Sequence, residues 1–267
     1  MRPDSGYGWS VLRELPGVGA PELSGEGDDT VIADMPRDTI LLCRAGSHAY
    51  GTSTDASDTD YRGVMYATSG MLIGLDTWDT QFERKGPDTV IYTLPKFVKL
   101  ALGANPNILD VLFCAVEDVL KVKRDGVELR HMASLFLSQR VYQTFTGYAH
   151  GQLKRLHNPG GRHAAHWSLV EKYGYDTKNA MHLVRLYRMG YEALTEGVIR
   201  VKRPDADELL AIRNGAWTLA EVEKYADDME LRCRAALSDT DLPPEPDTKR
   251  IVEWLMDTQR KRMVSND

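Results

Sequence analysis

The chain has 267 residues, of which 42% are hydrophobic and 27% are charged, so it is long enough to bury the core of one large domain or of two packed units. Its 33 Lys and Arg residues against 39 Asp and Glu residues give a formal net charge of −6, which excludes a uniformly basic surface of the kind that holds extended duplex DNA. Its three cysteines (Cys43, Cys114 and Cys233) form no Cys-x-x-Cys pair, and no apolar run approaches the roughly 18–20 residues of a membrane span, so we expect a cytoplasmic protein without a disulfide scaffold, a zinc ribbon or a membrane partner.

The first part of the chain is predicted to contain loops and strands. Residues 1–37 are rich in Gly, Pro and acidic residues, and we expect them to form an N-terminal extension that is mostly loop. The short apolar runs that follow predict three β-strands, at residues 39–43, 61–66 and 88–92. We interpret the basic run at residues 121–124 as a solvated connector.

From residue 94 onward, the apolar residues recur at helical spacing. The predicted helices cover residues 94–102, 126–133, 135–156, 177–197, 206–214, 219–237 and 249–262. This order of elements predicts an α+β fold. A small mixed β-sheet with flanking helices in residues 38–125 is followed by a mostly helical region, residues 126–267.

The most informative segment joins the first two predicted strands. Gly46 and Ser47 form a turn directly after the first strand, and glycine lets the backbone approach a ligand closely. If a helix starts there, its free amide groups suit a phosphate. Asp58 follows Ser47 by eleven residues, and Asp60 comes next but one. If Thr59 lies in a strand, both carboxylates share a face, where they repel each other unless a divalent cation such as Mg²⁺ holds them.

These motifs resemble those of the nucleotidyltransferase superfamily that includes DNA polymerase β and the aminoglycoside nucleotidyltransferases. More narrowly, residues 46–51 and 57–63 are similar to a polymerase-β-like family that occurs in bacteria and phages and is linked to RNA repair. Residues 94–97, 105–109 and 175–185 also match, so the resemblance spans about residues 39–215. The family favours Glu where this chain has Asp110, a position that we interpret as structural.

The resemblance implies transfer of a nucleoside monophosphate from an NTP to an acceptor hydroxyl, with release of pyrophosphate. The acceptor would be an RNA or tRNA end, and the helical region would close one side of the active-site cleft. Asp58 and Asp60 would hold two Mg²⁺ ions, or Mn²⁺ in their place. A third carboxylate on a later strand would complete the metal site and act as general base, and Asp88 is our candidate. Asp79 and Glu83 remain alternatives.

Phosphate-binding residues are expected on two elements. Gly46 and Ser47 would hold the β and γ phosphates of the NTP. Lys178, His182 and Arg185 share one face of a predicted helix at spacings i, i+4 and i+7, and they would neutralise phosphate charge or contact the acceptor. The alternative for this face is a solvated surface paired with acids.

Three other features keep two interpretations each. Tyr50 either stacks on a base or packs in the interior, and Arg62 either contacts phosphate or supports Asp60. The His-rich and Arg-rich segment at residues 157–166 is interpreted as a surface loop rather than as a metal site, and if it closes over substrate its basic residues would suit an RNA end.

Two other functions remain open beside RNA-end transfer. The same chemistry could act on a small molecule or a protein side chain. Alternatively, the chain could be a catalytically silent module that binds NTP or RNA.

Overall fold

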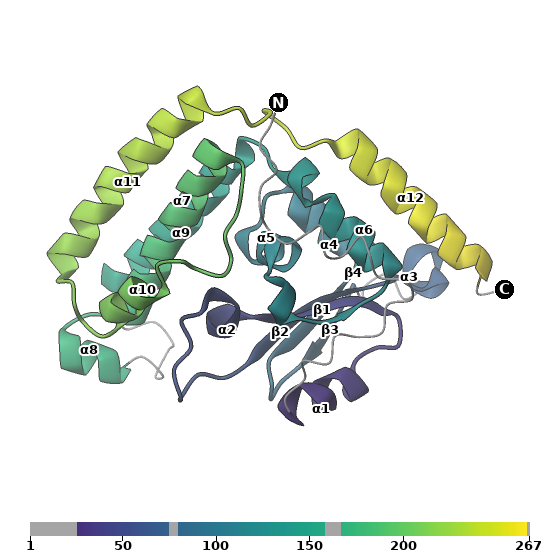
Figure 1. Cartoon of the computed structure of the whole chain (residues 1–267), viewed down its shortest axis with the longest axis horizontal. Coiled ribbons are helices and arrows are strands. Elements are labelled where there is room, and N and C mark those ends of the chain that lie inside the picture. Colours follow the sequence, from purple (N-terminus) through teal and green to yellow (C-terminus); the bar gives the residue numbers. More distant parts are fainter. Residues whose placement is uncertain (1–25, 75–79, 158–166, 266–267) are drawn as a thin grey trace.

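The computed structural model describes residues 26–74, 80–157 and 167–265, and it confirms an α+β fold (Figure 1). The five strands are β1 (Thr39–Ala45), β2 (Asp60–Met65), β3 (Gln81–Arg84), β4 (Thr89–Thr93) and β5 (Val119–Val122). The helices are α1 (Glu26–Asp34), α2 (Gly46–Tyr50), α3 (Ser69–Ile73), α4 (Leu94–Leu102), α5 (Pro106–Phe113), α6 (Arg124–His131), α7 (Arg140–His157), α8 (Trp167–Tyr173), α9 (Thr177–Glu196), α10 (Ala206–Arg213), α11 (Leu219–Asp239) and α12 (Thr248–Ser265). Among these described helices, none is both long enough and apolar enough to cross a membrane.

The strands form one mixed sheet in the order β3-β4-β2-β1-β5. The three predicted strands are β1, β2 and β4 in its centre, and the two edge strands were not predicted. The interpretation of residues 121–124 as a connector is wrong for Lys121 and Val122, which pair with β1. Both edge strands have only four residues, and charged side chains interrupt their apolar pattern, as is common at the edges of sheets.

The register of the central strands brings three chain segments to one edge of the sheet. Strand β2 runs antiparallel to β1, with Asp60 opposite Ala45, and parallel to β4, with Tyr61 opposite Thr89. The end of β1 therefore lies beside the starts of β2 and β4. As a result, the turn after β1 and the acidic residues before β2 and β4 lie close together.

Helix α1 covers one face of the sheet (Figure 1). Its Val31 packs with Leu42, Tyr61 and Ile91 in a small apolar cluster. The prediction that residues 1–37 are mostly loop is therefore wrong for α1, and residues 1–25 lie outside the described part. The helix was missed because its sequence carries few apolar residues, which gives little helical periodicity.

The other face of the sheet carries the main hydrophobic core, which continues from the sheet into the helices. Helices α7, α9 and α11 lie side by side, and α12 runs along the side of α4 (Figure 1). The same buried cluster contains Ile40 of β1 and Ile251 of α12. In addition, the Trp254 indole donates a hydrogen bond to Glu128 Oε2 at 3.1 Å. The core thus joins the sheet region to the helical region across residue 125.

Gly126 allows the close packing of α6 on β1. A Cβ at this position would lie 2.3 Å from the Ile40 carbonyl oxygen, so Gly126→Ala must push the helix away from the sheet. We expect this change to lower the free energy of unfolding by about 1–3 kcal/mol. The control is Gly147→Ala in α7, where an added Cβ meets nothing within 4 Å and the change should stabilise the helix by about 0.5–1 kcal/mol. Urea denaturation measures both, and equal stabilities would contradict this packing.

Candidate active site

The turn after β1 packs directly against an acidic side chain. Gly46 has φ +61, in the left-handed region that favours glycine, and it opens the short helix α2. A Cβ at Gly46 would lie 2.4 Å from Asp60 Oδ2. Glycine is therefore required by both the backbone and the available space. This contact places the Asp60 carboxylate against the Gly46-Ser47 turn.

A segment of the helical region holds the far end of α2. Lys202 Nζ donates to the His48 carbonyl at 3.3 Å and to Asp118 Oδ2 at 3.0 Å. The backbone amide of Arg203 donates to the Tyr50 carbonyl at 3.0 Å. Because these bonds satisfy carbonyls at the C-terminal end of α2, they fix the orientation of the turn at its other end.

Three carboxylates gather around the start of β2. Asp60 is partly buried, whereas Asp58 is exposed and the side chain of Asp88 is 55% exposed. The charges of Asp58 and Asp88 both act on Asp60. Strand β2 begins at Asp60, so the condition that Thr59 lies in a strand is not met, and Asp58 belongs to the preceding loop. Asp88 therefore reaches Asp60 because of the register between β2 and β4, whereas Asp58 reaches it from the loop before β2.

The electrostatic balance at Asp60 disfavours its negative charge. Burial raises the pKa of the Asp60 carboxyl above its usual range, and the negative charges of Asp88 and Asp58 raise it further. Arg62 and Lys178 act in the opposite direction, because they are positively charged. A bound cation would stabilise the ionised form of Asp60 in the same way.

Arg62 forms its direct ion pair with Asp88, while its charge also acts on Asp60. Its Nη2 lies 2.8 Å from Asp88 Oδ2, and its Nη1 donates to the Tyr61 carbonyl at 2.8 Å and to the Asp88 carbonyl at 3.1 Å. The sequence left open whether Arg62 contacts phosphate or supports Asp60. The observed geometry is closer to a supporting role, but the acid that it supports directly is Asp88.

The carboxylates are chemically suited to Mg²⁺ but are not already assembled around a metal position. Within residues 26–74, 80–157 and 167–265, no three His, Cys, Asp or Glu side chains are placed to hold one ion. Asp58, Asp60 and Asp88 supply hard oxygen ligands of the type that Mg²⁺ prefers. Asp88 Oδ2 is paired with Arg62, so this oxygen would have to exchange its partner to join Asp60 on a cation.

His48 lies between α2 and the loop that carries Asp58. Its Nε2 is 3.5 Å from the Ser57 carbonyl oxygen and 3.4 Å from Thr59 Oγ1, so the ring bridges to the residues on both sides of Asp58. Within the loop, the Thr54 amide donates to Ser57 Oγ at 2.9 Å. His48 was not among the predicted site residues, although its position directly after the Gly46-Ser47 turn could have indicated it.

Helix α9 directs part of its predicted cationic face toward the acids. Asp176 caps the helix by accepting a hydrogen bond from the Asn179 amide at 3.0 Å. Lys178, in the first turn, is partly buried, and its charge acts on Asp60. His182, one turn later, is also partly buried. The structure thus brings Lys178 to the same group as the turn and the carboxylates.

Tyr50 and Arg185 lie inside the protein with Asp110. Their exposed fractions are 6%, 5% and 7%, in the order Tyr50, Arg185 and Asp110. The Tyr50 hydroxyl donates to Asp110 Oδ2 at 2.5 Å, and the Arg185 guanidinium lies 3.6 Å from the centre of the Tyr50 ring. Burial raises the pKa of Asp110, while Arg185 and the Tyr50 hydrogen bond lower it. This cluster ties α2, α5 and α9 together, so it fits the packing interpretation of Tyr50 and gives Arg185 protein partners instead of a phosphate.

The remaining candidates lie elsewhere. Glu83 is on β3, where its Oε1 accepts a hydrogen bond from the Gln81 side chain. Asp79 and residues 158–166 lie outside the described residues.

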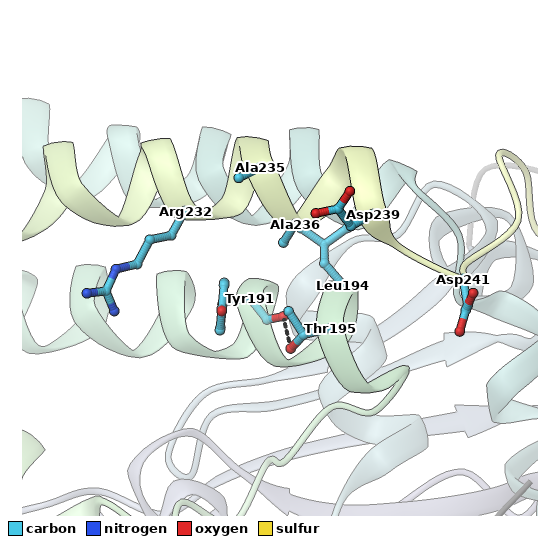
Figure 2. A pocket seen from close by; sticks show the side chains of 8 residues that line it. All are labelled: Tyr191, Leu194, Thr195, Arg232, Ala235, Ala236, Asp239 and Asp241. Carbon is cyan, nitrogen blue, oxygen red and sulfur yellow. Dashed lines mark hydrogen bonds between the residues drawn. The ribbon is translucent and has the colours of Figure 1, made fainter.

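A separate groove of about 380 Å³ lies between α9 and α11 (Figure 2). Figure 2 shows Arg232 toward one end and Asp239 and Asp241 toward the other. Tyr191, which lines the groove, is thirteen residues beyond Lys178 on α9, or about 20 Å along the helix axis. The groove is therefore distinct from the acidic group.

The raised pKa of Asp60 predicts a gain in stability when its charge is removed. The folded state binds this proton more tightly than the unfolded state, so ionisation at neutral pH lowers the free energy of unfolding. We expect Asp60→Asn to raise the Tm at about pH 7 in metal-free buffer. The gain should shrink as the pH falls and vanish below about pH 4, because Asp60 is protonated first in the folded state and then in the unfolded state as well. Thermal denaturation across this range measures the effect.

The matched control is Asp55→Asn, because Asp55 is an exposed acid in the same loop. Its Tm should follow that of the wild type at every pH. A lower Tm for Asp60→Asn at neutral pH would contradict the electrostatic balance described for this residue.

Comparison with known proteins identifies a family and a phage relative. Residues 29–257 match the family model RlaP, described as the RNA repair pathway DNA polymerase beta family. A protein of Enterobacteria phage T4, named "Uncharacterized 38.9 kDa protein in nrdC-mobD intergenic region", is 28% identical over 139 residues. That match covers 48% of this chain and 41% of the phage protein, so the chain corresponds to less than half the length of this relative. Because the family model covers most of the sequence, the chain belongs to the RNA repair pathway DNA polymerase beta family.

Proposed function

We propose that this protein is a metal-dependent nucleotidyltransferase that moves a nucleoside monophosphate from an NTP to a hydroxyl of an RNA or tRNA end. The observation that carries this proposal is the contact between Gly46 and Asp60, which sets a glycine-serine turn against a carboxylate. Such a site needs a phosphate-binding element and metal-binding acids side by side. Membership of an RNA repair polymerase-β family supports the same chemistry and the choice of an RNA acceptor.

The triphosphate would lie between the turn and α9. The first backbone amides of a helix have no carbonyl partner within it, which leaves the amides after Gly46 able to donate to phosphate oxygens. Lys178 would neutralise charge on the pyrophosphate as it leaves. In this arrangement, the helical region of residues 126–267 closes the cleft from the side of α9.

The carboxylates of Asp58, Asp60 and Asp88 would hold two Mg²⁺ ions, or Mn²⁺ in their place. When bound, these ions neutralise the triphosphate and make the acceptor hydroxyl more acidic. Asp88 would receive the proton of that hydroxyl, and its exposed side chain leaves room for an acceptor. Arg62 would keep Asp88 oriented through the backbone bond to the Asp88 carbonyl.

The proposed reaction is one in-line displacement. The acceptor oxygen forms a bond to the α phosphorus as the bond to the bridging oxygen of the β phosphate breaks. Pyrophosphate leaves with that electron pair, and the hydroxyl proton passes to the carboxylate. The protein therefore supplies position and charge, which are the main requirements of phosphoryl transfer.

A second candidate is a catalytically silent module that binds an NTP. The Arg62–Asp88 ion pair favours it, because this pair occupies the third carboxylate. Both candidates predict nucleotide binding at the Gly46-Ser47 turn. Only the enzyme is expected to transfer the nucleotide to an acceptor.

A transfer assay tests the proposed reaction. Wild-type protein is incubated with each α-labelled NTP, Mg²⁺ and either total tRNA, short RNA or small hydroxyl acceptors. We expect label on RNA, and a loss of at least about 100-fold in Asp58→Ala and in Asp60→Ala, because each removes a ligand of the metal clamp. Asp55→Ala, in the same loop, should retain wild-type activity. Equal transfer by the wild type and both active-site variants would refute the mechanism.

Calorimetry, combined with the transfer assay, separates catalysis from silent binding. The NTP affinity of the wild type should rise when Mg²⁺ is added, because the acids and the triphosphate share the ions. In the Asp58→Ala, Asp60→Ala double variant, we expect the same affinity with and without Mg²⁺. Metal-dependent NTP binding in the wild type without any label transfer would support the silent module and contradict the enzyme.

A further inference from the structure

We infer that Tyr92, Tyr148 and Lys96 form an acceptor subsite that binds the unpaired end of an RNA strand beside Asp88. This inference rests on the proposed function, because it assigns the acceptor side of the same site. It gives a role to three residues that were not among the predicted site residues, although Lys96 lies in the matching segment 94–97. Each of the three belongs to a different element, namely β4, α7 and α4.

Tyr92 lies on the strand that follows Asp88 and on the side of the sheet that carries the acids. Side chains alternate along a strand, so Asp88 and Tyr92 share a side, about 13 Å apart along the strand. Ile91 faces the cluster under α1, whereas Tyr92 packs against the main core and stays partly exposed. A strand of RNA that reaches Asp88 along the sheet would therefore pass Tyr92.

Tyr148, on α7, provides a second exposed aromatic ring in this region. It is 39% exposed, and its hydroxyl accepts a hydrogen bond from the Asn105 side-chain amide at 3.1 Å, which places it at the start of α5. The two tyrosines are close enough to interact electrostatically: burial raises the pKa of Tyr92, and Tyr148 adds to this rise. Unpaired bases stack on exposed aromatic rings whatever their sequence.

Lys96 supplies positive charge at the same place. Its ammonium nitrogen lies 5.9 Å from the centre of the Tyr92 ring. Rings for bases and a cation for phosphate are the two components of single-strand binding sites. Glu83 and Asp88 also act on Tyr92, so the surface is mixed in charge and suits a short RNA end better than a long duplex.

The order of the strands places this surface on the acceptor side. The Gly46-Ser47 turn follows β1, Asp60 starts β2, and Tyr92 belongs to β4, with β2 between the other two strands. In-line displacement requires the attacking oxygen to be opposite the leaving pyrophosphate. If the triphosphate lies at the turn, the acceptor must approach from β4. The rings are therefore assigned to the RNA and not to the base of the NTP.

Binding of RNA without nucleotide tests this subsite directly. Fluorescence anisotropy is measured with a labelled single-stranded RNA oligonucleotide in EDTA, for full-length wild type, Tyr148→Ala, Tyr148→Phe and Lys96→Ala. We expect Tyr148→Ala to weaken binding at least about fivefold and Tyr148→Phe to retain it, because the ring and not the hydroxyl stacks. Lys96→Ala should reduce the salt dependence of log K by about 0.7, as expected for one lost phosphate contact on a single strand.

Tyr191→Ala is the matched control, because Tyr191 is a similarly exposed tyrosine that lines the groove between α9 and α11 (Figure 2). It should bind RNA as the wild type does. Unchanged affinity in Tyr148→Ala, equal losses in Tyr148→Ala and Tyr191→Ala, or no RNA binding by the wild type would overturn the subsite.

A parallel NTP titration with Mg²⁺ shows whether a negative result concerns only the acceptor subsite or the proposed function as a whole. Tyr148→Ala should bind NTP with wild-type affinity, in agreement with a subsite for RNA alone. If Tyr148→Ala lost NTP affinity instead, the ring would belong to the nucleotide site and the acceptor assignment would be wrong.

Discussion

The contact between Gly46 and the Asp60 carboxylate is the constraint on which the site depends. It exists because β1 and β2 pair antiparallel, with Ala45 opposite Asp60, so that the residue after β1 lies beside the residue that starts β2. Any side chain at Gly46 would occupy the position of Asp60 Oδ2. The sheet therefore couples a turn suited to phosphate with an acid whose ionisation is disfavoured until positive charge arrives.

The helical region stabilises this contact from behind. Arg185 and Asp110 enclose Tyr50 at the end of α2, and Lys202 and Arg203 bond to carbonyls of the same helix. A helix of five residues has little stability of its own, so these tertiary contacts hold its position. The burial of Arg185 thus contributes to the site through α2, while Lys178 on the same helix contributes charge directly.

Local patterns predicted the centre of the fold, and long-range contacts account for what was missed. The central strands and α4 were found because their apolar residues follow clear periods, and α4 has the predicted bounds. The edge strands and α1 carry weak periodicity and form only because neighbours cover them. The Gly46-Ser47 turn and Asp60 were identified by sequence spacing. In contrast, the Arg62–Asp88 pair and the burial of Arg185 depend on strand register and helix packing, which one sequence does not reveal.

A crystal structure with Mn²⁺ and a non-hydrolysable NTP analogue would test the central claim most directly. The account predicts anomalous scattering from metal ions coordinated by Asp58 and Asp60, with the triphosphate against the Gly46-Ser47 turn and Asp88 turned from Arg62 toward the second ion. Analogue bound away from this turn, for example in the groove between α9 and α11, or metal with no ligand from Asp60, would contradict it.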